Sequence, residues 1–283
     1  GGVRLVRDST RGLVRLALLQ STFLLACGAG ERPEQAPPGV ADASAGTVVI
    51  VHGAWGGAWD WRETADSLES LGYETHRVTL TGLGERNHLL SADIDLTTHV
   101  TDVANVLRWE ELEDVILVGH SYGGMVITGV AEVVPERIRR LVYLDAFLPM
   151  DGECAMAIGR PGGPEEYSRP ASLGEAMGMS VIDDAIPPGW VPEDAAVPKD
   201  VSHPVGTLVE PLDLEGDPGH GVPIAYIITR EEPGGEDGFD VPAERADALG
   251  WPVVEYVGGH VPYREDPGGI ARLLVSFEDP PGA

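Results

Sequence analysis

The sequence predicts an α/β protein with a doubly wound, mostly parallel sheet and an inserted cap. Short runs of β-branched and other apolar residues alternate with stretches of helical spacing from residue 47 onward, as in a series of βα units. A stretch rich in Pro and Gly, about 150–221, interrupts this alternation. With 283 residues, 43% of them hydrophobic, the chain is long and apolar enough to bury a full core as one domain with an insertion.

The first strand is expected at 47–51, where a continuous run of Thr, Val and Ile ends at His52. A run without polar alternation is typical of a strand that is buried on both faces of a parallel sheet. Similar runs predict five further strands, at 75–80, 115–118, 141–144, 224–229 and 253–257. Because ligands bind outside the carboxyl ends of such strands, functional residues are expected where the strands end.

Three helices are expected between these strands. Apolar residues near helical spacing mark the first, at 59–71. The second, at 98–107, is expected to open with Thr98 as its N-cap, and the third, at 125–134, stops before Pro135.

The stretch from 150 to about 221 is rich in Pro, Gly, Met and acidic residues, and its helical signals are weak. We expect it to form a cap that is inserted after one strand and lies over the sheet edge where a substrate would sit. A surface excursion without a catalytic role is the alternative.

The first 27 residues resemble an export signal. Four arginines and one aspartate precede an apolar run of about eleven residues, which is too short to span the roughly 30 Å hydrocarbon layer as a helix. The run ends in Leu-Leu-Ala-Cys-Gly, which resembles a bacterial lipobox with Cys27 as the lipidated residue. We therefore expect a lipoprotein signal at 1–27, a flexible tether at 28–46 and a folded domain at 47–283. Such a protein would be exported to the cell envelope, and a lipid anchor at Cys27 would be its only attachment to the membrane. The alternative is that a mis-called start codon has added the amino-terminal segment, which would imply a cytoplasmic protein.

Charge and composition exclude several kinds of partner. Against 46 Asp and Glu stand 19 Lys and Arg, so the formal charge is −27. Because phosphate binding needs clustered basic residues, no nucleic acid is expected as a partner, and an anionic membrane surface is equally disfavoured. No phosphate loop or dinucleotide fingerprint is present in the sequence. The spacing of four histidines does not match that of a metal site: His52, His76, His88 and His99. No metal or cofactor is therefore expected.

Residues 115–134 read as a strand, a sharp turn and a helix, with Gly-His-Ser-Tyr-Gly at the turn. A Gly-x-Ser-x-Gly turn holds its serine in a strained conformation at the sheet edge, where side chains in place of the glycines would collide with a neighbouring strand or helix. The N-terminus of the following helix favours developing negative charge. Ser121 is therefore the candidate nucleophile.

A serine hydroxyl needs a base to take its proton, and in the chain order Ser, acid, His this base comes after the nucleophile. Three histidines follow Ser121, and two of them, His203 and His220, fall in the expected cap. The third, His260, comes after the strand at 253–257 and two glycines that form a tight turn. We therefore expect His260 to be the catalytic base.

The oxyanion of a tetrahedral intermediate needs backbone N–H donors. One is expected from Tyr122, directly after the nucleophile. The other is expected from Ala54, in the glycine-rich loop after the first strand, where Gly53 lets the backbone approach the substrate closely. His52 is expected to hold this loop by hydrogen bonds and to transfer no proton.

Residues 52–61, the serine turn and the later Gly-Gly-His together resemble the α/β-hydrolase superfamily. Within it, the chain is similar to the branch of plant methylesterases and hydroxynitrile lyases, and the stretches 81–86 and 141–149 are similar to its bacterial esterase members. The likeness covers 47 to about 150 closely and 222–275 more loosely, without the cap. It implies the α/β-hydrolase fold and serine hydrolase chemistry.

Two positions separate the esterases of this branch from the lyases. The lyases place a lysine directly after the catalytic histidine and a threonine directly after the histidine that ends the first strand. Here these positions hold Val261 and Gly53, and the single lysine of the chain is Lys199, in the cap. A haloalkane dehalogenase would need an aspartate in place of Ser121. The resemblance therefore favours an esterase.

Two carboxylates are candidates for orienting His260. Asp145 ends the apolar strand at 141–144, and a carboxylate buried there needs a partner such as the Nδ1–H of the histidine. Some α/β-hydrolases carry their acid after this strand, whereas the spacing in the plant esterases points to Glu232, in an acidic, glycine-rich loop after the next strand. Glu231 is a further alternative.

The expected function is that of a serine esterase that hydrolyses a small to medium carboxylic ester through an acyl-enzyme on Ser121. Two alternatives use the same scaffold: a ligand-binding protein with slow turnover, and a transferase that passes the acyl group to an acceptor other than water. An apolar pocket for the acyl or alcohol group is expected to be lined by Trp55, Trp59 or Tyr122, together with cap residues such as Met177, Met179 and Trp190.

Overall fold

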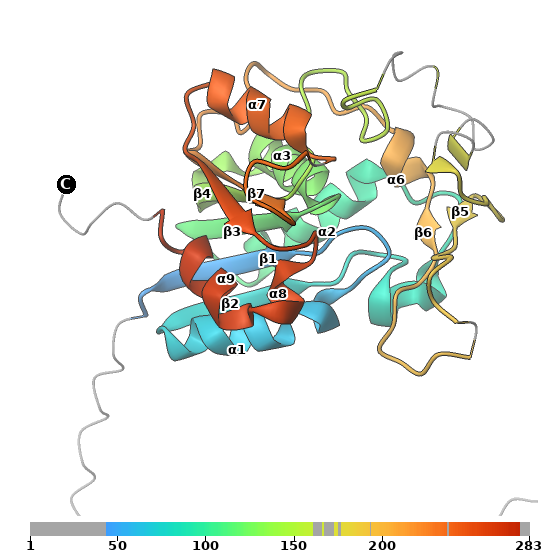
Figure 1. Cartoon of the computed structure of the whole chain (residues 1–283), viewed down its shortest axis with the longest axis horizontal. Coiled ribbons are helices and arrows are strands. Elements are labelled where there is room, and N and C mark those ends of the chain that lie inside the picture. Colours follow the sequence, from blue (N-terminus) through green and yellow to red (C-terminus); the bar gives the residue numbers. More distant parts are fainter. Residues whose placement is uncertain are drawn as a thin grey trace, which may run out of the picture. The chain divides into compact units, whose positions relative to one another are not determined.

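A six-stranded sheet organises the computed structural model, which describes residues 44–160, 166, 173–174, 177–192, 194–236 and 238–277 (Figure 1). The strands are β1 (Gly46–Val51), β2 (Tyr73–Val78), β3 (Val115–His120), β4 (Ile138–Leu144), β7 (Ile224–Arg230) and β8 (Val253–Val257). Their order is β2-β1-β3-β4-β7-β8, and every pairing between neighbours is parallel. The doubly wound parallel sheet predicted from the alternating apolar runs is therefore confirmed.

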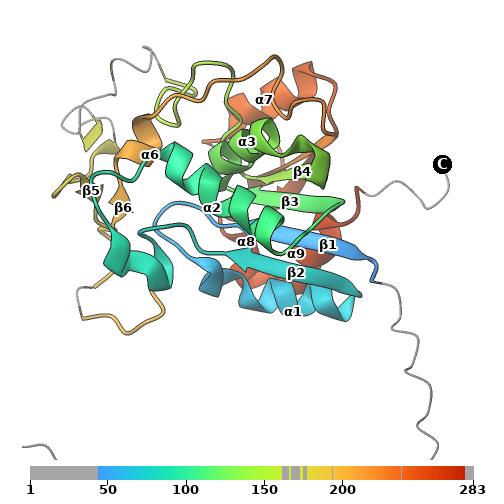
Figure 2. The same ribbon diagram turned by 180° about the vertical axis from the view of Figure 1, so that it is seen from behind.

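Helices cover both faces of this sheet (Figures 1 and 2). One face packs against α1 (Arg62–Ser70), α8 (Pro262–Glu265) and α9 (Pro267–Leu274), and the other against α2 (Leu96–Trp109), α3 (Gly123–Val133) and α7 (Asp240–Ala248). Along β1, Val49 and Val51 join the core under α2 and α3, whereas Val48 and Ile50 join the core under α1 and α9. Because side chains of a strand alternate between faces, a sheet that is covered on both faces requires apolar residues at every position.

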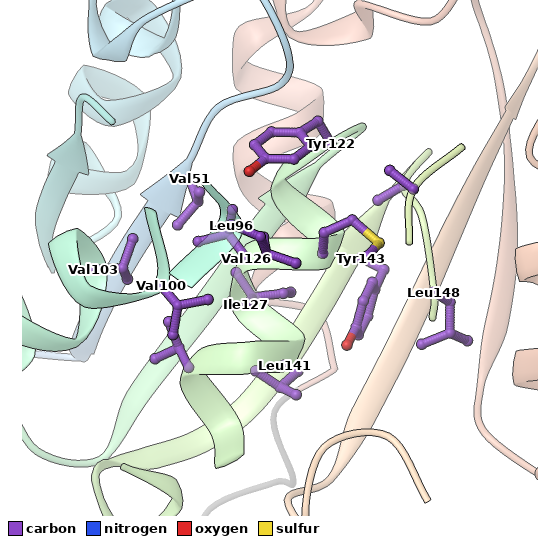
Figure 3. Packing of buried hydrophobic residues seen from close by; sticks show 14 of the residues in the cluster. Val51, Leu96, Val100, Val103, Tyr122, Val126, Ile127, Leu141, Tyr143 and Leu148 are labelled. Carbon is purple, nitrogen blue, oxygen red and sulfur yellow. The ribbon is translucent and has the colours of Figure 1, made fainter. Parts of the chain in front are cut away.

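Side chains from both α2 and α3 pack together in the core on this face of the sheet (Figure 3). Val100 and Val103 of α2 lie beside Val126 and Ile127 of α3, and all four are buried. Nine of the eleven residues of α3 are buried, because the helix runs from the end of β3 back across the sheet. The start of α3 is thereby fixed at the sheet edge.

Three helix starts differ from the sequence prediction, and the first, expected at 59, lies in a 3₁₀ turn (Ala58–Trp61) that precedes α1. The helix predicted at 98–107 begins at Leu96, and its N-cap is Asp95, so the assignment of Thr98 as the N-cap was wrong. The Asp95 carboxylate accepts a hydrogen bond from the Thr98 backbone N at 2.8 Å, and Thr98 occupies the N3 position of a capping box. Both residue types cap helices, and the earlier one takes the position because the apolar pattern already begins at Leu96. The third helix begins two residues earlier than expected, at Gly123.

The cap lies between β4 and β7 and adds no strand to the central sheet in the part of the chain that is described. It contains a small antiparallel pair, β5 (Ala185–Ile186) and β6 (His203–Pro204), followed by the helix α6 (Gly206–Val209). Arg245 of α7 ties the start of the cap to the body, because its guanidinium binds the Glu153 carboxylate at 2.6 and 2.8 Å. At the far end, the Glu210 carboxylate accepts hydrogen bonds from the first turn of α2.

Residues 1–43 lie outside the described residues, so the expected signal at 1–27, most of the tether at 28–46 and Cys27 have no structural account. Cys154 is buried and is not part of a disulfide. Within the described ranges, no helix has the length and apolar character needed to cross a membrane. The same ranges hold no group of three or more His, Cys, Asp or Glu side chains placed to bind a metal ion.

Candidate active site

Ser121 follows β3 at a sharp turn that holds its backbone in the left-handed region, with φ of 54°. A residue other than glycine in this region stores strain of about 1–3 kcal/mol, so its surroundings must hold it there. The Ser121 N–H donates to the carbonyls of Leu144 and Asp145 at 3.3 and 3.2 Å, and its own carbonyl accepts from the Phe147 N–H at 3.1 Å. These bonds tie the serine turn to the end of β4.

The glycines at both ends of the serine turn are required by close approach of the backbone. A Cβ at Gly119 would lie 2.7 Å from the carbonyl oxygen of Gly123, and a Cβ at Gly123 would lie 2.6 Å from the carbonyl oxygen of Val51. No side chain fits at such distances, so the pattern allows β1, β3 and α3 to meet. Ser121 is thereby placed between the ends of β1 and β3, where the strand order reverses and parallel sheets bind their ligands.

His260 and Asp145 are brought together from positions 115 residues apart. The Nδ1–H of His260 donates to Oδ2 of Asp145 at 2.6 Å, and Oδ1 of the same carboxylate accepts from the Thr229 N–H at 2.9 Å. The Asp145 side chain is fully buried, while that of His260 is 43% exposed. Because Nδ1 is engaged by the carboxylate, Nε2 is the nitrogen of His260 that can accept a proton.

Of the two acids expected from the sequence, the structure brings Asp145 to His260. The end of β4 pairs with β7, and the Asp145 N–H donates to the Ile227 carbonyl at 2.7 Å, which directs the carboxylate toward the loop after β8. Glu231 and Glu232 lie exposed in the loop after β7, where they border a separate hollow of about 820 Å³ that reaches the other side of His260. Neither is the partner of the His260 Nδ1–H.

Two aromatic rings support His260, and neither was predicted from the sequence to do so. The Phe239 ring stacks on the imidazole with centroids 5.1 Å apart and an angle of 5° between the planes. On the other side, the Nε2–H of His120 donates to the His260 carbonyl at 2.7 Å. Burial lowers the pKa of His120 well below its ordinary value, and its Nδ1 has no partner within the described residues. His120 stands inside the serine motif, but nothing in the sequence marks Phe239.

Ser121 and His260 line one cavity of about 200 Å³. The loop at 53–57 forms another part of its wall and is here called the oxyanion loop, after the oxyanion donor that the sequence predicts in it. In the described part of the chain, the N–H groups of Ala54 and Tyr122 have no hydrogen-bond acceptor. A Cβ at Gly53 would lie 2.9 Å from Nδ1 of His120 and 3.0 Å from Cβ of Ser121, so this glycine allows the loop to reach the serine.

His52 holds the oxyanion loop through both ring nitrogens. Its Nδ1–H donates to the Gly53 carbonyl at 2.7 Å, and its Nε2 accepts from the Leu80 N–H at 3.2 Å. Burial lowers the pKa of His52, which keeps the ring neutral in this arrangement. These contacts agree with the expectation that His52 has a holding role.

The Tyr122 side chain is fully buried, so the expectation that it lines the pocket was wrong. Its hydroxyl donates to Nδ1 of His99 at 2.9 Å, because the Nε2–H of His99 donates to the Thr81 carbonyl at 2.8 Å and leaves Nδ1 as an acceptor. Burial lowers the pKa of His99 to about 4. The pair anchors the residue after Ser121 to α2, and the isolated position of His99 in the sequence gave no sign of this role.

The cavity wall is more polar than the apolar pocket predicted from the sequence. Trp55 and Trp190 line it, as expected, but Trp59 borders neighbouring hollows, and Met177 and Met179 pack against the core under α2 and α3. Three charged side chains line the cavity in addition: Asp60, Asp200 and Arg264.

These three charged groups are linked to one another. The Arg264 guanidinium binds the Asp60 carboxylate, with the closest N–O distance at 2.6 Å, and Nη2 lies 3.8 Å from Oδ1 of Asp200. The indole N–H of Trp190 donates to the other oxygen of Asp200 at 2.9 Å. The cap thus places the Trp190 ring and the Asp200 carboxylate in the cavity wall, and no sequence pattern predicted that the two would be hydrogen-bonded there.

Comparisons with known proteins agree with this geometry. A family model described as the alpha/beta hydrolase family matches residues 48–273. A carbendazim hydrolyzing esterase from Nocardioides sp. is 36% identical over 81% of this chain and 98% of its own length, and methylesterase 1 from Arabidopsis thaliana is 36% identical over 36% of this chain and 39% of its own. An extracellular alpha/beta-hydrolase from a Paenibacillus species, described as sharing structural and functional homology with tobacco salicylic acid binding protein 2, has a TM-score of 0.65 and 27% identity over 83% of this chain and 99% of that one.

Proposed function

The chain belongs to the alpha/beta hydrolase family, and from this premise we propose that it hydrolyses a small carboxylic ester through an acyl-enzyme on Ser121. The observation that carries the proposal is the 2.6 Å bond between His260 Nδ1 and the buried Asp145 carboxylate, beside a serine on a strained turn. Relatives named as esterases, with the Nocardioides protein matching along nearly its whole length, support ester hydrolysis as the reaction class.

In the proposed reaction, the Ser121 hydroxyl oxygen attacks the ester carbonyl carbon while Nε2 of His260 takes its proton. Asp145 holds the imidazole through Nδ1–H and stabilises the imidazolium that forms. The alcohol then leaves with the proton from Nε2, and the acyl group remains on Ser121. Water, activated by the same nitrogen, attacks the acyl carbonyl and releases the acid.

The oxyanion that forms in each step is proposed to bind the N–H groups of Ala54 and Tyr122. Both groups lack another acceptor among the described residues, and Tyr122 is the N-cap of α3, where the helix dipole favours negative charge. Donors of this kind contribute about 10²–10³ to kcat each. The serine turn and the oxyanion loop are therefore each proposed to supply one N–H donor to the oxyanion.

The size of the cavity favours a small ester. Its volume of about 200 Å³ lies below the roughly 300–1,000 Å³ of pockets that enclose drug-sized ligands. Trp55 and Trp190 offer aromatic surface to the acyl or alcohol group, and Asp200 offers a carboxylate to a substrate N–H or O–H. Carbendazim, named in the Nocardioides relative, is therefore a reasonable member of a substrate panel.

The neighbourhood of Ser121 also supports hydrolysis over lyase chemistry. A side chain at Gly53 would displace either His120 or Ser121, so the position that holds threonine in the lyases has no room for one here. Val261 follows His260 in the cavity wall, and Lys199 borders different hollows. No lysine ammonium is therefore available to stabilise cyanide beside the reacting atoms in the described part of the chain.

The test is turnover of p-nitrophenyl acetate and p-nitrophenyl butyrate, together with labelling by a fluorophosphonate. We expect turnover and a single labelled peptide containing Ser121 in the wild type, and neither in Ser121→Ala. Ser70→Ala, which alters an exposed serine at the end of α1, is the matched control and should behave as the wild type. Labelling without turnover would favour a ligand-binding role, and preferential transfer of the acyl group to added alcohols would favour a transferase.

A further inference from the structure

The cap makes three hydrogen bonds to a single residue of the oxyanion loop, Trp55. Its backbone N–H donates to Nδ1 of His203 at 3.3 Å, and its carbonyl accepts from the Val201 N–H at 2.9 Å. Its indole N–H donates to the Ile186 carbonyl at 2.9 Å. Trp55 directly follows Ala54, the proposed oxyanion donor, so the cap fixes the residue next to that donor.

Trp55 needs such support because its backbone lies in the left-handed region, with φ of 63°. A residue other than glycine stays in this region only when its surroundings hold it there. Its ring also contacts the cap, packing edge-on against Trp190 and lying 5.7 Å from the His203 ring. The cap therefore holds both the backbone and the side chain of Trp55.

The hydrogen bonds around His203 fix the tautomer that accepts from Trp55. The Thr207 hydroxyl donates to the Pro204 carbonyl at 2.8 Å, so it accepts the Nε2–H of His203 at 2.7 Å. With the proton on Nε2, Nδ1 is an acceptor for the Trp55 N–H. His203 is completely buried, and burial lowers its pKa well below the ordinary value, which keeps the ring neutral.

The two strands of the cap make this support rigid. Ile186 of β5 pairs with His203 of β6, so the group that holds the indole and the group that holds the backbone of Trp55 belong to one antiparallel pair (Figure 1). The pair is extended by the Val205 N–H, which donates to the Asp184 carbonyl at 2.9 Å. Movement of either strand would therefore move Trp55.

We infer that His203 is a positioning residue, which holds the Ala54–Trp55 peptide so that the Ala54 N–H stays directed at the oxyanion. This inference rests on the proposed function, because it assigns Ala54 to the oxyanion. Two consecutive peptide planes share the Ala54 Cα, so rotation of the plane after Ala54 disturbs the plane that carries its N–H. A donor that is aligned in advance contributes most, since reorientation during the reaction is avoided.

The experiment compares His203→Leu with His203→Asn on p-nitrophenyl acetate. His203→Leu removes the acceptor, and we expect kcat to fall about 10- to 100-fold, a fraction of the 10²–10³ that a lost donor costs, with KM within about threefold. Asn carries an amide oxygen near the place of Nδ1, and we expect it to restore kcat to within about fivefold of the wild type. The inhibition constant of a trifluoromethyl ketone, whose serine adduct carries an oxyanion, should rise in parallel with the loss of kcat.

Leu208→Ala is the control for general damage to the cap. Leu208 is buried in α6 and has no hydrogen bond to Trp55, so this variant should lower Tm while kcat stays near the wild-type value. Wild-type kcat in a folded His203→Leu variant would overturn the inference, as would an equal loss of kcat in Leu208→Ala. Absence of turnover in the wild type would instead refute the proposed function, so the two failures are distinguishable.

Thr207→Val provides a second variant if His203→Leu does not fold. It removes the acceptor of the Nε2–H with little change of shape, so the ring loses its preference for the tautomer that accepts from Trp55. Because Thr207 also hydrogen-bonds the Tyr122 side chain, Tyr122→Phe is the control for that second contact and should cost less kcat than Thr207→Val. We expect kcat to fall about fivefold or more, less than for His203→Leu, with KM again nearly unchanged. Wild-type kcat in this variant would contradict the role of His203.

Discussion

The central sheet and the cap build opposite sides of the candidate site by different means. The sheet brings three side chains together at its carboxyl edge: Ser121 after β3, Asp145 after β4 and His260 after β8. The cap acts mainly on backbone, through the three hydrogen bonds that it makes to Trp55. In the proposed reaction, the sheet therefore fixes the groups that exchange protons, while the cap fixes the loop that is proposed to bind the oxyanion.

The largest effect should come from the sheet side, in His260→Ala. The proposed base would be lost, and we expect kcat to fall about 10⁵-fold or more. Because the His260 side chain is 43% exposed, the variant should fold, and circular dichroism with Tm would verify this. A folded variant that keeps more than about one per cent of wild-type kcat would remove the imidazole from the mechanism.

The second prediction separates the two acids. Asp145→Asn should keep a similar shape but lose about 10⁴ in kcat, because an amide cannot stabilise the imidazolium and favours the wrong tautomer. Glu232→Gln, in the exposed loop after β7, serves as its counterpart and should change kcat less than about threefold. Equal losses in both variants, or no loss of about two orders of magnitude in either, would refute the assignment of Asp145.

The sequence pointed to Ser121 and His260 because each follows a strand in a short glycine-containing pattern, with glycines on both sides of Ser121 and two glycines before His260. The acid could be narrowed only to Asp145 and Glu232, with Glu231 as a further alternative, since the choice depends on how β4, β7 and the loop after β8 meet in space. The pairing of Leu144 with Ile227 and the bond from the Thr229 N–H to Asp145 place the Asp145 carboxylate beside His260. None of these contacts has a counterpart in sequence periodicity.

The cap side could not be predicted in the same way. Its strands are two residues long, too short for an alternating pattern, and the bond from Trp55 to His203 joins residues 148 positions apart. The rings of His99 and His203 also lie within the same buried region, with centroids 6.2 Å apart, although the sequence places one in a helix and the other in the cap. Because both rings are buried, their nitrogens bond to protein groups instead of water, and which groups they meet depends on the fold.

A third prediction tests the contact between the serine turn and the oxyanion loop. In Gly53→Ala, the new Cβ would press on His120 and Ser121, and a shift of about 1 Å at the reacting groups lowers kcat by about 100-fold. Gly189→Ala, at a cap position with no atom within 4 Å, is the matched control and should leave kcat unchanged. If both variants have wild-type kcat, the close approach at Gly53 has no part in the reaction.

The smallest effect concerns stability at acid pH. The pKa of His99 is about 4 in the folded chain and 6.5 without burial, so the unfolded chain binds the proton first as pH falls. Stability is therefore complete above pH 6.5 and is lost progressively down to about pH 4, by about 3 kcal/mol for this group. Urea unfolding between pH 7 and 4.5 would measure the slope, which should be shallower in His99→Gln; an unchanged slope would show that His99 is not the titrating group.

The acyl-enzyme on Ser121 is the central claim, and trapping it is the most direct test. Wild-type protein mixed with p-nitrophenyl butyrate and quenched in acid within the first turnover should show a burst of p-nitrophenol close to one per active site. Mass spectrometry should then find a butyryl group on the peptide that contains Ser121, and none in Ser121→Ala. Turnover without a burst or adduct, or a butyryl group on another residue, would contradict the claim.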